Sequence, residues 1–153
     1  MKTAIYPGSF DPVTLGHLNI IKRAAQCFDR VIVCVMVNSK KHGLFTPEER
    51  VELLKKDTAR FPNVEVDYSD GLLAAYAKRR KAHVVVKGLR AVSDFEQEVQ
   101  MAVINRKLNP RLETMFLASS DKYTYLSSTV VKEMARYGAC LLYASDAADD
   151  LIG

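Results

Sequence analysis

The sequence predicts an α/β fold in which a parallel sheet carries helices on both faces. Five short apolar segments alternate along the chain with amphipathic segments of helical period. Strands and helices that alternate at this spacing form parallel sheets through right-handed crossovers. The chain has 153 residues, 48% of them hydrophobic, and no linker, repeat or low-complexity segment interrupts it. These properties fit one soluble domain with its own core.

The first half of the chain contains the clearest local signals. Residues 31–37 form a β-branched run that predicts a buried strand. Thr46, Pro47 and Glu49 combine an N-cap residue, a proline at the first helical position and the glutamate of a capping box. A helix is therefore expected to begin at Pro47. The other elements expected in this half are strands at residues 2–6 and 64–68 and a helix at residues 17–28.

In the second half, a long helix is expected between Asp94, as its N-cap, and about Leu108. Apolar residues recur along it at helical spacing, so Phe95, Val99 and Val103, with Ala102, are expected to face the core. The remaining elements expected here are helices at residues 72–81 and 128–137 and strands at residues 83–87 and 113–117.

Residues 7–17 form the turn between the first predicted strand and the first predicted helix. Ligands of open α/β sheets bind in such turns, outside the carboxyl ends of the strands. Gly8 permits close approach of the backbone to a ligand, and Ser9 offers a hydroxyl group. Gly16 and His17 lie at the expected helix N-terminus, which favours phosphate. His17 is expected to donate a hydrogen bond to that phosphate from either ring nitrogen.

The residues of this turn also resemble a known motif. Thr14-Leu15-Gly16-His17 is similar to the T/H-x-G-H signature of the nucleotidyltransferase superfamily. The longer segment 6–17, with later motifs in the right order, resembles the bacterial phosphopantetheine adenylyltransferases. The resemblance covers residues 2 to about 138. It implies a Rossmann-like single domain with a five-stranded parallel sheet, and assembly as a homohexamer.

The resemblance also implies an activity. The family transfers the adenylyl group of ATP to 4′-phosphopantetheine, forming dephospho-CoA and pyrophosphate in coenzyme A biosynthesis. The acceptor phosphate is already anionic, so the reaction needs no general base and no covalent intermediate. It needs two polyanions held in line and fixed donors for the transition-state charge. We expect Mg²⁺ as cofactor, held mainly by ATP phosphates, and therefore no cluster of protein metal ligands.

Two cationic segments follow predicted strands. Residue types alone favour solvated lysines at Lys40 and Lys41, whereas the resemblance implies that Lys41 contacts the acceptor phosphate. The segment 87–90 resembles the family's R-G-x-R motif, in which Arg90 matches an ATP-phosphate ligand and Lys87 a substrate ligand. Lysine replaces the first arginine and loses its bidentate fork, so the contact that Lys87 makes stays open.

Other residues have a structural and a functional interpretation. Glu98 is either a surface carboxylate or lies near the nucleotide, and Leu73 either packs in the core or contacts the pantetheine arm. The hydroxyl residues before the last helix can cap it and bind phosphate with the same N–H groups. The resemblance assigns ATP binding to Ser9, Phe10, His17, Gly88, Leu89, Arg90, Glu98, Tyr123, Thr124, Tyr125, Leu126, Ser127, Ser128 and Thr129. It assigns substrate binding to Ser9, Lys41, Leu73 and Lys87, and catalysis to His17, as transition-state stabiliser, with Lys41 and Arg90.

Composition excludes several classes of protein. The net charge of +4 comes without a basic block interleaved with aromatic residues, so nucleic acid is not an expected partner. No apolar run approaches the roughly 20 residues of a membrane span, and no signal-peptide pattern appears, so a cytoplasmic protein is expected. The absence of GxxxxGK and of GxGxxG after the first strand disfavours P-loop kinases and dinucleotide oxidoreductases. Cys27, Cys34 and Cys140 lack CxxC spacing and are expected to be buried free thiols.

Two alternatives and one departure stay open. The chain is alternatively a cytidylyl- or adenylyltransferase for another phosphate acceptor, or a non-catalytic module that binds a nucleotide or CoA. Residues 1–138 are expected to form the nucleotidyltransferase domain. Residues 139–153 form a divergent C-terminal tail that differs from the family pattern and contains no candidate ligand.

Overall fold

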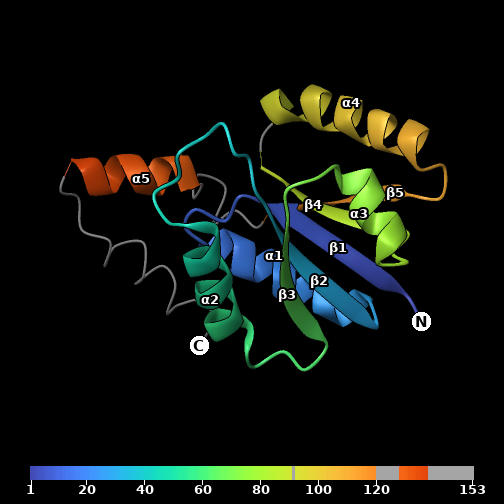
Figure 1. Cartoon of the computed structure of the whole chain (residues 1–153), viewed down its shortest axis with the longest axis horizontal. Coiled ribbons are helices and arrows are strands. Elements are labelled where there is room, and N and C mark those ends of the chain that lie inside the picture. Colours follow the sequence, from blue (N-terminus) through green and yellow to red (C-terminus); the bar gives the residue numbers. More distant parts are fainter. Residues whose placement is uncertain (91, 120–127, 138–153) are drawn as a thin grey trace.

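The computed structural model describes residues 1–90, 92–119 and 128–137. Its five strands form one parallel sheet with the order β3-β2-β1-β4-β5. Helices cover both faces of this sheet (Figure 1), so the predicted fold class is confirmed. The elements are β1 (Thr3–Gly8), α1 (Leu15–Cys27), β2 (Arg30–Met36), α2 (Pro47–Thr58), β3 (Val64–Ser69), α3 (Leu73–Arg79), β4 (Val84–Leu89), α4 (Val92–Leu108), β5 (Glu113–Ala118) and α5 (Ser128–Arg136).

Two helix starts show how far capping residues determine the boundaries. Helix α2 begins at Pro47 as predicted, because Thr46 and Glu49 satisfy each other's backbone N–H groups. Helix α1 begins at Leu15, two residues earlier than predicted, because the side chain of Thr14 caps it. The expectation that Asp94 caps α4 is wrong. That helix begins at Val92, and Asp94 lies in its first turn, where the positive end of the helix dipole stabilises a carboxylate.

The core has two parts, one on each face of the central strands. On the first face, Leu18 and Ile21 of α1 and Leu54 of α2 pack with Val31 and Val33 of β2, and all are buried. On the second face, residues of α3 that include Ala74, Tyr76 and Ala77 pack with Ile5 and Ile32. Each fully buried aliphatic side chain contributes about 1.5–3 kcal/mol, so the central strands are the most firmly held part of the fold.

Helix α4 differs from its prediction in the direction of its apolar side. Phe95 and Val103, both expected in the core, are 49% and 52% exposed. Apolar residues occur around most of this helix, so helical spacing alone could not identify the side that packs on the sheet. The resulting α4 apolar surface consists of Phe95, Met101, Val103, Ile104 and Leu108.

The cysteines partly follow the prediction. Cys34 in β2 is a buried free thiol, and burial raises its pKa to about 11. Cys27 is also free but exposed, because the last residue of α1 lies on the solvent side; the expectation of burial is wrong there. Cys140 lies outside the described residues. Among the described residues, no helix is both long and apolar enough to cross a membrane.

Candidate active site

A cavity of about 170 Å³ opens at the carboxyl ends of the strands, where β1 and β4 lie side by side and α1 begins. The strand order reverses at this pair of strands. From β1 the chain adds β2 and then β3 on one side, and it then returns to add β4 and β5 on the other side of β1. Such switch points are where open α/β sheets bind ligands. The cavity is lined by Tyr6, Pro7, Thr14, Gly16, His17, Ile20, Lys87, Gly88, Arg90, Glu98 and Ser119.

His17 has a fixed orientation within this cavity. Its Nδ1 atom accepts a hydrogen bond from the backbone N–H of Thr14 at 2.9 Å. In return, the backbone N–H of His17 donates to the Thr14 hydroxyl at 3.2 Å. A neutral imidazole that accepts at Nδ1 carries its proton at Nε2. The expectation that either ring nitrogen can donate is therefore wrong. Only Nε2 can serve a ligand, because the helix cap occupies Nδ1.

The surroundings of His17 keep its ring neutral. Burial and, after it, the positive charge of Arg90 lower the pKa of His17 to about 4. Its ring contacts that of Phe10 edge to face, with centroids 4.9 Å apart, and Phe10 packs in the same way on Tyr6 at 5.3 Å. At neutral pH, His17 is thus a neutral hydrogen-bond donor held in one position by a cap and an aromatic neighbour.

Phe10 supports the site from below. The whole residue is 1% exposed, so its ring has no free face for a nucleotide, and the expectation that Phe10 contacts ATP directly finds no support in this cavity. The backbone of Phe10 has a φ of 48°, a left-handed conformation that residues other than glycine rarely adopt. The buried contacts of the ring offset the cost of this conformation.

Lys87 and Glu98 form an ion pair in the wall of the cavity. The Nζ atom of Lys87 lies 3.5 Å from Oε2 of Glu98, and both side chains are partly buried. Within the described part of the chain, this buried oxygen accepts no hydrogen bond. Glu98 is therefore more than a surface carboxylate, since it lies beside a cation in the cavity wall. Gly88, which follows Lys87 in β4, allows this strand to approach α1 closely, because a Cβ atom on it would lie 3.3 Å from Ile20.

Several predicted ligands lie elsewhere. Ser9 and Lys41 do not line this cavity; both are exposed, in the loops that follow β1 and β2. Leu73 is partly buried and packs on the core of the second face, which fits its structural interpretation. Leu89 ends β4, where its carbonyl accepts the N–H of Ser119 at 2.9 Å. Residues 123–127 lie outside the described residues, as does the tail 139–153; Ser128 and Thr129 begin α5.

The cavity also contains residues that the sequence-based list of ligands omitted. Tyr6 and Pro7 belong to β1 itself, and Ile20 extends from α1. Ser119 directly follows β5, so its position after a strand was a signal of the kind used for Lys41 and Lys87. Burial raises the pKa of Tyr6, although the charge of Arg90 opposes this effect. Tyr6 is thus a neutral hydroxyl group in the site.

The chain resembles known proteins along most of its length. Residues 5–134 match the family model described as cytidylyltransferase-like. The phosphopantetheine adenylyltransferase of Caldanaerobacter subterraneus subsp. tengcongensis is 61% identical over 92% of this chain and 88% of its own length. The enzyme of the same name from Clostridium botulinum strain Hall is 54% identical over 92% of this chain and 86% of its own. The chain belongs to the phosphopantetheine adenylyltransferase family.

Solved structures agree with this family at the level of the fold. A putative nicotinate-nucleotide adenylyltransferase from Vibrio parahaemolyticus superimposes with a TM-score of 0.68 at 19% identity, over 92% of this chain and 91% of that one. The lipopolysaccharide core biosynthesis protein from Thermoplasma volcanium GSS1 has a TM-score of 0.58 at 19% identity, over 78% of this chain and 97% of that one. Membership of the phosphopantetheine adenylyltransferase family thus rests on sequence, and the two structures support the Rossmann-like fold.

Proposed function

We propose that this protein transfers the adenylyl group of ATP to 4′-phosphopantetheine, releasing pyrophosphate and forming dephospho-CoA. High identity to curated phosphopantetheine adenylyltransferases over nearly the whole chain supports this reaction. The observation in the site that supports this reaction best is the neutral ring of His17. Because Thr14 occupies its Nδ1 atom, the Nε2–H group is the donor available to a ligand. Such a donor suits a phosphoryl oxygen that gains charge during transfer.

In this mechanism the protein positions and stabilises, and it takes no proton from the acceptor. The phosphate of the acceptor is the nucleophile and attacks the α-phosphorus of ATP, while the bond to pyrophosphate breaks. His17 donates to an α-phosphate oxygen through Nε2. Arg90, also in the cavity lining, offsets the negative charge of the nucleotide. Lys41 is proposed to hold the acceptor phosphate from the loop after β2.

Mg²⁺ is proposed to arrive with ATP and to offset the charge of its phosphates. Among residues 1–90, 92–119 and 128–137, no group of three or more His, Cys, Asp or Glu side chains could hold a metal ion. The buried Oε2 atom of Glu98 is a hard acceptor in the cavity wall, which suits a water carried by such an ion. A cytoplasmic location is proposed as well, because the reaction consumes ATP.

The reaction is tested by measuring pyrophosphate release after the protein is mixed with MgATP and 4′-phosphopantetheine. Unphosphorylated pantetheine is the matched control, because it differs only in the proposed nucleophile. We expect release with the phosphorylated acceptor alone. Release with both acceptors would contradict the phosphate as nucleophile, and release with neither, while ATP still binds, would contradict the proposed reaction.

A homohexamer is proposed as the assembly, and the α4 apolar surface supports self-association. Monomers rarely leave this many large apolar side chains exposed on one helix. The protein is expected to have the mass of six chains by light scattering. Ile104→Glu, at one residue of that surface, is expected to shift the mass to smaller species because it would place a charge in the interface. Leu44→Glu, at an exposed leucine outside α4, is the control; a monomeric unmodified chain would contradict the assembly.

A further inference from the structure

Asp11 is a buried carboxylate that the proposed chemistry does not use. It is 2% exposed. In the sequence it follows Phe10 and precedes α1, the helix that contains His17. One oxygen, Oδ1, accepts the backbone N–H of Phe45 at 2.8 Å, and the other, Oδ2, accepts that of Leu44 at 2.8 Å. Oδ2 also accepts a hydrogen bond from Nζ of Lys132 at 2.8 Å. A carboxylate at this depth is stable only because charges and N–H groups surround it.

Arg50 and Gly43 complete this arrangement. The Nε atom of Arg50 lies 3.5 Å from Oδ1 of Asp11 and donates to the carbonyl of Phe45 at 2.9 Å. The side chain of Arg50 is itself only 9% exposed. A Cβ atom on Gly43 would lie 1.8 Å from a guanidinium nitrogen of Arg50 and 2.6 Å from Oδ2 of Asp11. The backbone of the loop is thus packed directly against the ion pair, and a side chain at position 43 would displace Arg50 or Asp11.

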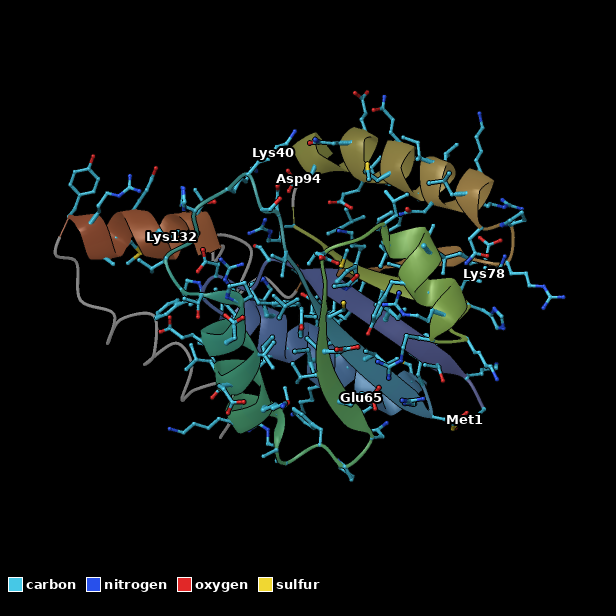
Figure 2. All side chains as sticks on the ribbon, in the orientation of Figure 1. Met1, Lys40, Glu65, Lys78, Asp94 and Lys132 are labelled. Atoms are coloured by element: carbon cyan, nitrogen blue, oxygen red, sulfur yellow. The ribbon has the colours of Figure 1, made fainter. Side chains whose placement is uncertain are left out.

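These contacts join three segments that are distant in the sequence. Asp11 belongs to the loop after β1, the partners at 43–45 to loop 37–46 between β2 and α2, and Lys132 to α5. Figure 1 shows loop 37–46 arching between α5 and α4, and Figure 2 shows Lys40 near its crest and Lys132 on α5. Lys41 lies three residues before Leu44, so the anchored end of the loop limits where the lysine can go.

We propose that Asp11 is a positioning residue, which docks loop 37–46 with Lys41, and helix α5, onto the loop that presents His17. This inference rests on the proposed function, in which Lys41 acts on the acceptor phosphate. Asp11 touches no substrate. It acts through Lys41 on one side and through α5 on the other, so that phosphate-binding groups from separate segments converge on one site.

The kinetic test is a double-mutant cycle of Asp11→Asn and Lys41→Ala. Asn keeps the size of the side chain but removes the charge that holds Arg50 and Lys132. We expect Asp11→Asn to raise the KM for 4′-phosphopantetheine more than it lowers kcat. Lys41→Ala is expected to cost about tenfold less in kcat/KM in the Asp11→Asn background than in the unmodified protein. Equal costs of Lys41→Ala in both backgrounds would overturn the proposal.

A second measurement does not depend on activity. Trypsin cleavage after Lys40 or Lys41 in the ligand-free protein reports how often loop 37–46 opens, and mass spectrometry identifies the fragments. Asp11→Asn is expected to speed this cleavage about tenfold, because cleavage follows the population of the open loop. An unchanged rate would overturn the docking role. If the unmodified protein lacks adenylyl transfer, the proposed function fails, while this measurement still decides the role of Asp11.

Two further variants separate docking from general destabilisation. Glu65→Gln removes another paired carboxylate. Glu65 lies in β3, away from loop 37–46 (Figure 2), and pairs with Arg30 of β2 and with Arg80, which follows α3. Glu65→Gln is expected to change neither the cost of Lys41→Ala in kcat/KM nor the rate of trypsin cleavage. A tenfold faster cleavage in Glu65→Gln would overturn the proposal. Lys132→Gln removes one partner of Asp11 at a partly exposed position on α5. It is expected to act in the same direction as Asp11→Asn, with a smaller effect, and no effect in a folded protein would overturn the α5 part.

Discussion

Replacing His17 by alanine is expected to lower kcat by about 10²-fold or more, the range for the loss of one oxyanion donor. The effect falls on kcat because the Nε2–H group serves charge that develops during transfer, and KM for ATP should change much less. Steady-state kinetics of pyrophosphate release measure both values. His83→Ala is a matched control, because His83 is exposed and precedes β4, at the amino end of that strand and away from the cavity.

The stability of the helix cap has to be checked in the same variant. Alanine also removes the acceptor for the N–H of Thr14, so a folded variant has to be shown before the loss of kcat is assigned to Nε2. His17→Asn keeps a donor group on a shorter side chain and is expected to retain more activity than alanine. Near-normal kcat in a folded His17→Ala protein would contradict the role of transition-state stabiliser.

The protonation state of His17 gives the same prediction a pH dependence. Because its pKa falls to about 4 in the folded protein, the ring should stay neutral across the range in which an ordinary histidine titrates. The unfolded chain binds the proton near pH 6.5. The stability that His17 contributes is therefore fully present above that pH and is lost as pH falls toward 4. NMR titration of the ligand-free protein measures this pKa directly, and a midpoint near 6.5 would contradict it.

Local signals in the sequence predicted the parts of the site that depend on neighbours along the chain. The T-x-G-H segment placed His17 at a helix N-terminus, and Thr46 with Glu49 placed the start of α2. The choice of the donor nitrogen in His17 was beyond the sequence. Both nitrogens are equivalent in a list of residue types, and only the position of the Thr14 N–H distinguishes them.

Long-range contacts account for most of what the sequence could not predict. Asp11 and Lys132 are separated by 121 positions, so no periodicity connects them. The strand order places β1 beside β4, which puts Arg90 close enough to His17 to affect its pKa. The packed side of α4 was also undetermined, since apolar residues occur around most of the helix. Each of these features depends on which segments meet in space.

Arg90→Gln is expected to lower kcat/KM for ATP by about 10²-fold or more, because a cation that offsets phosphoryl charge is lost in the cavity. The same change is expected to raise the pKa of His17, since the positive charge of Arg90 opposes protonation of the ring. The rise should be partial, because burial is the larger cause of the low pKa.

Arg90→Lys separates these two effects. It keeps the charge, so the pKa of His17 should remain low, but it loses the planar fork that binds phosphate oxygens in pairs. We therefore expect its kcat/KM to lie between those of the unmodified protein and Arg90→Gln. Kinetics and NMR titration of both variants check this order. Full activity in Arg90→Gln would exclude Arg90 from the catalytic set, whereas an unchanged His17 pKa in that variant would mean that burial alone keeps the ring neutral.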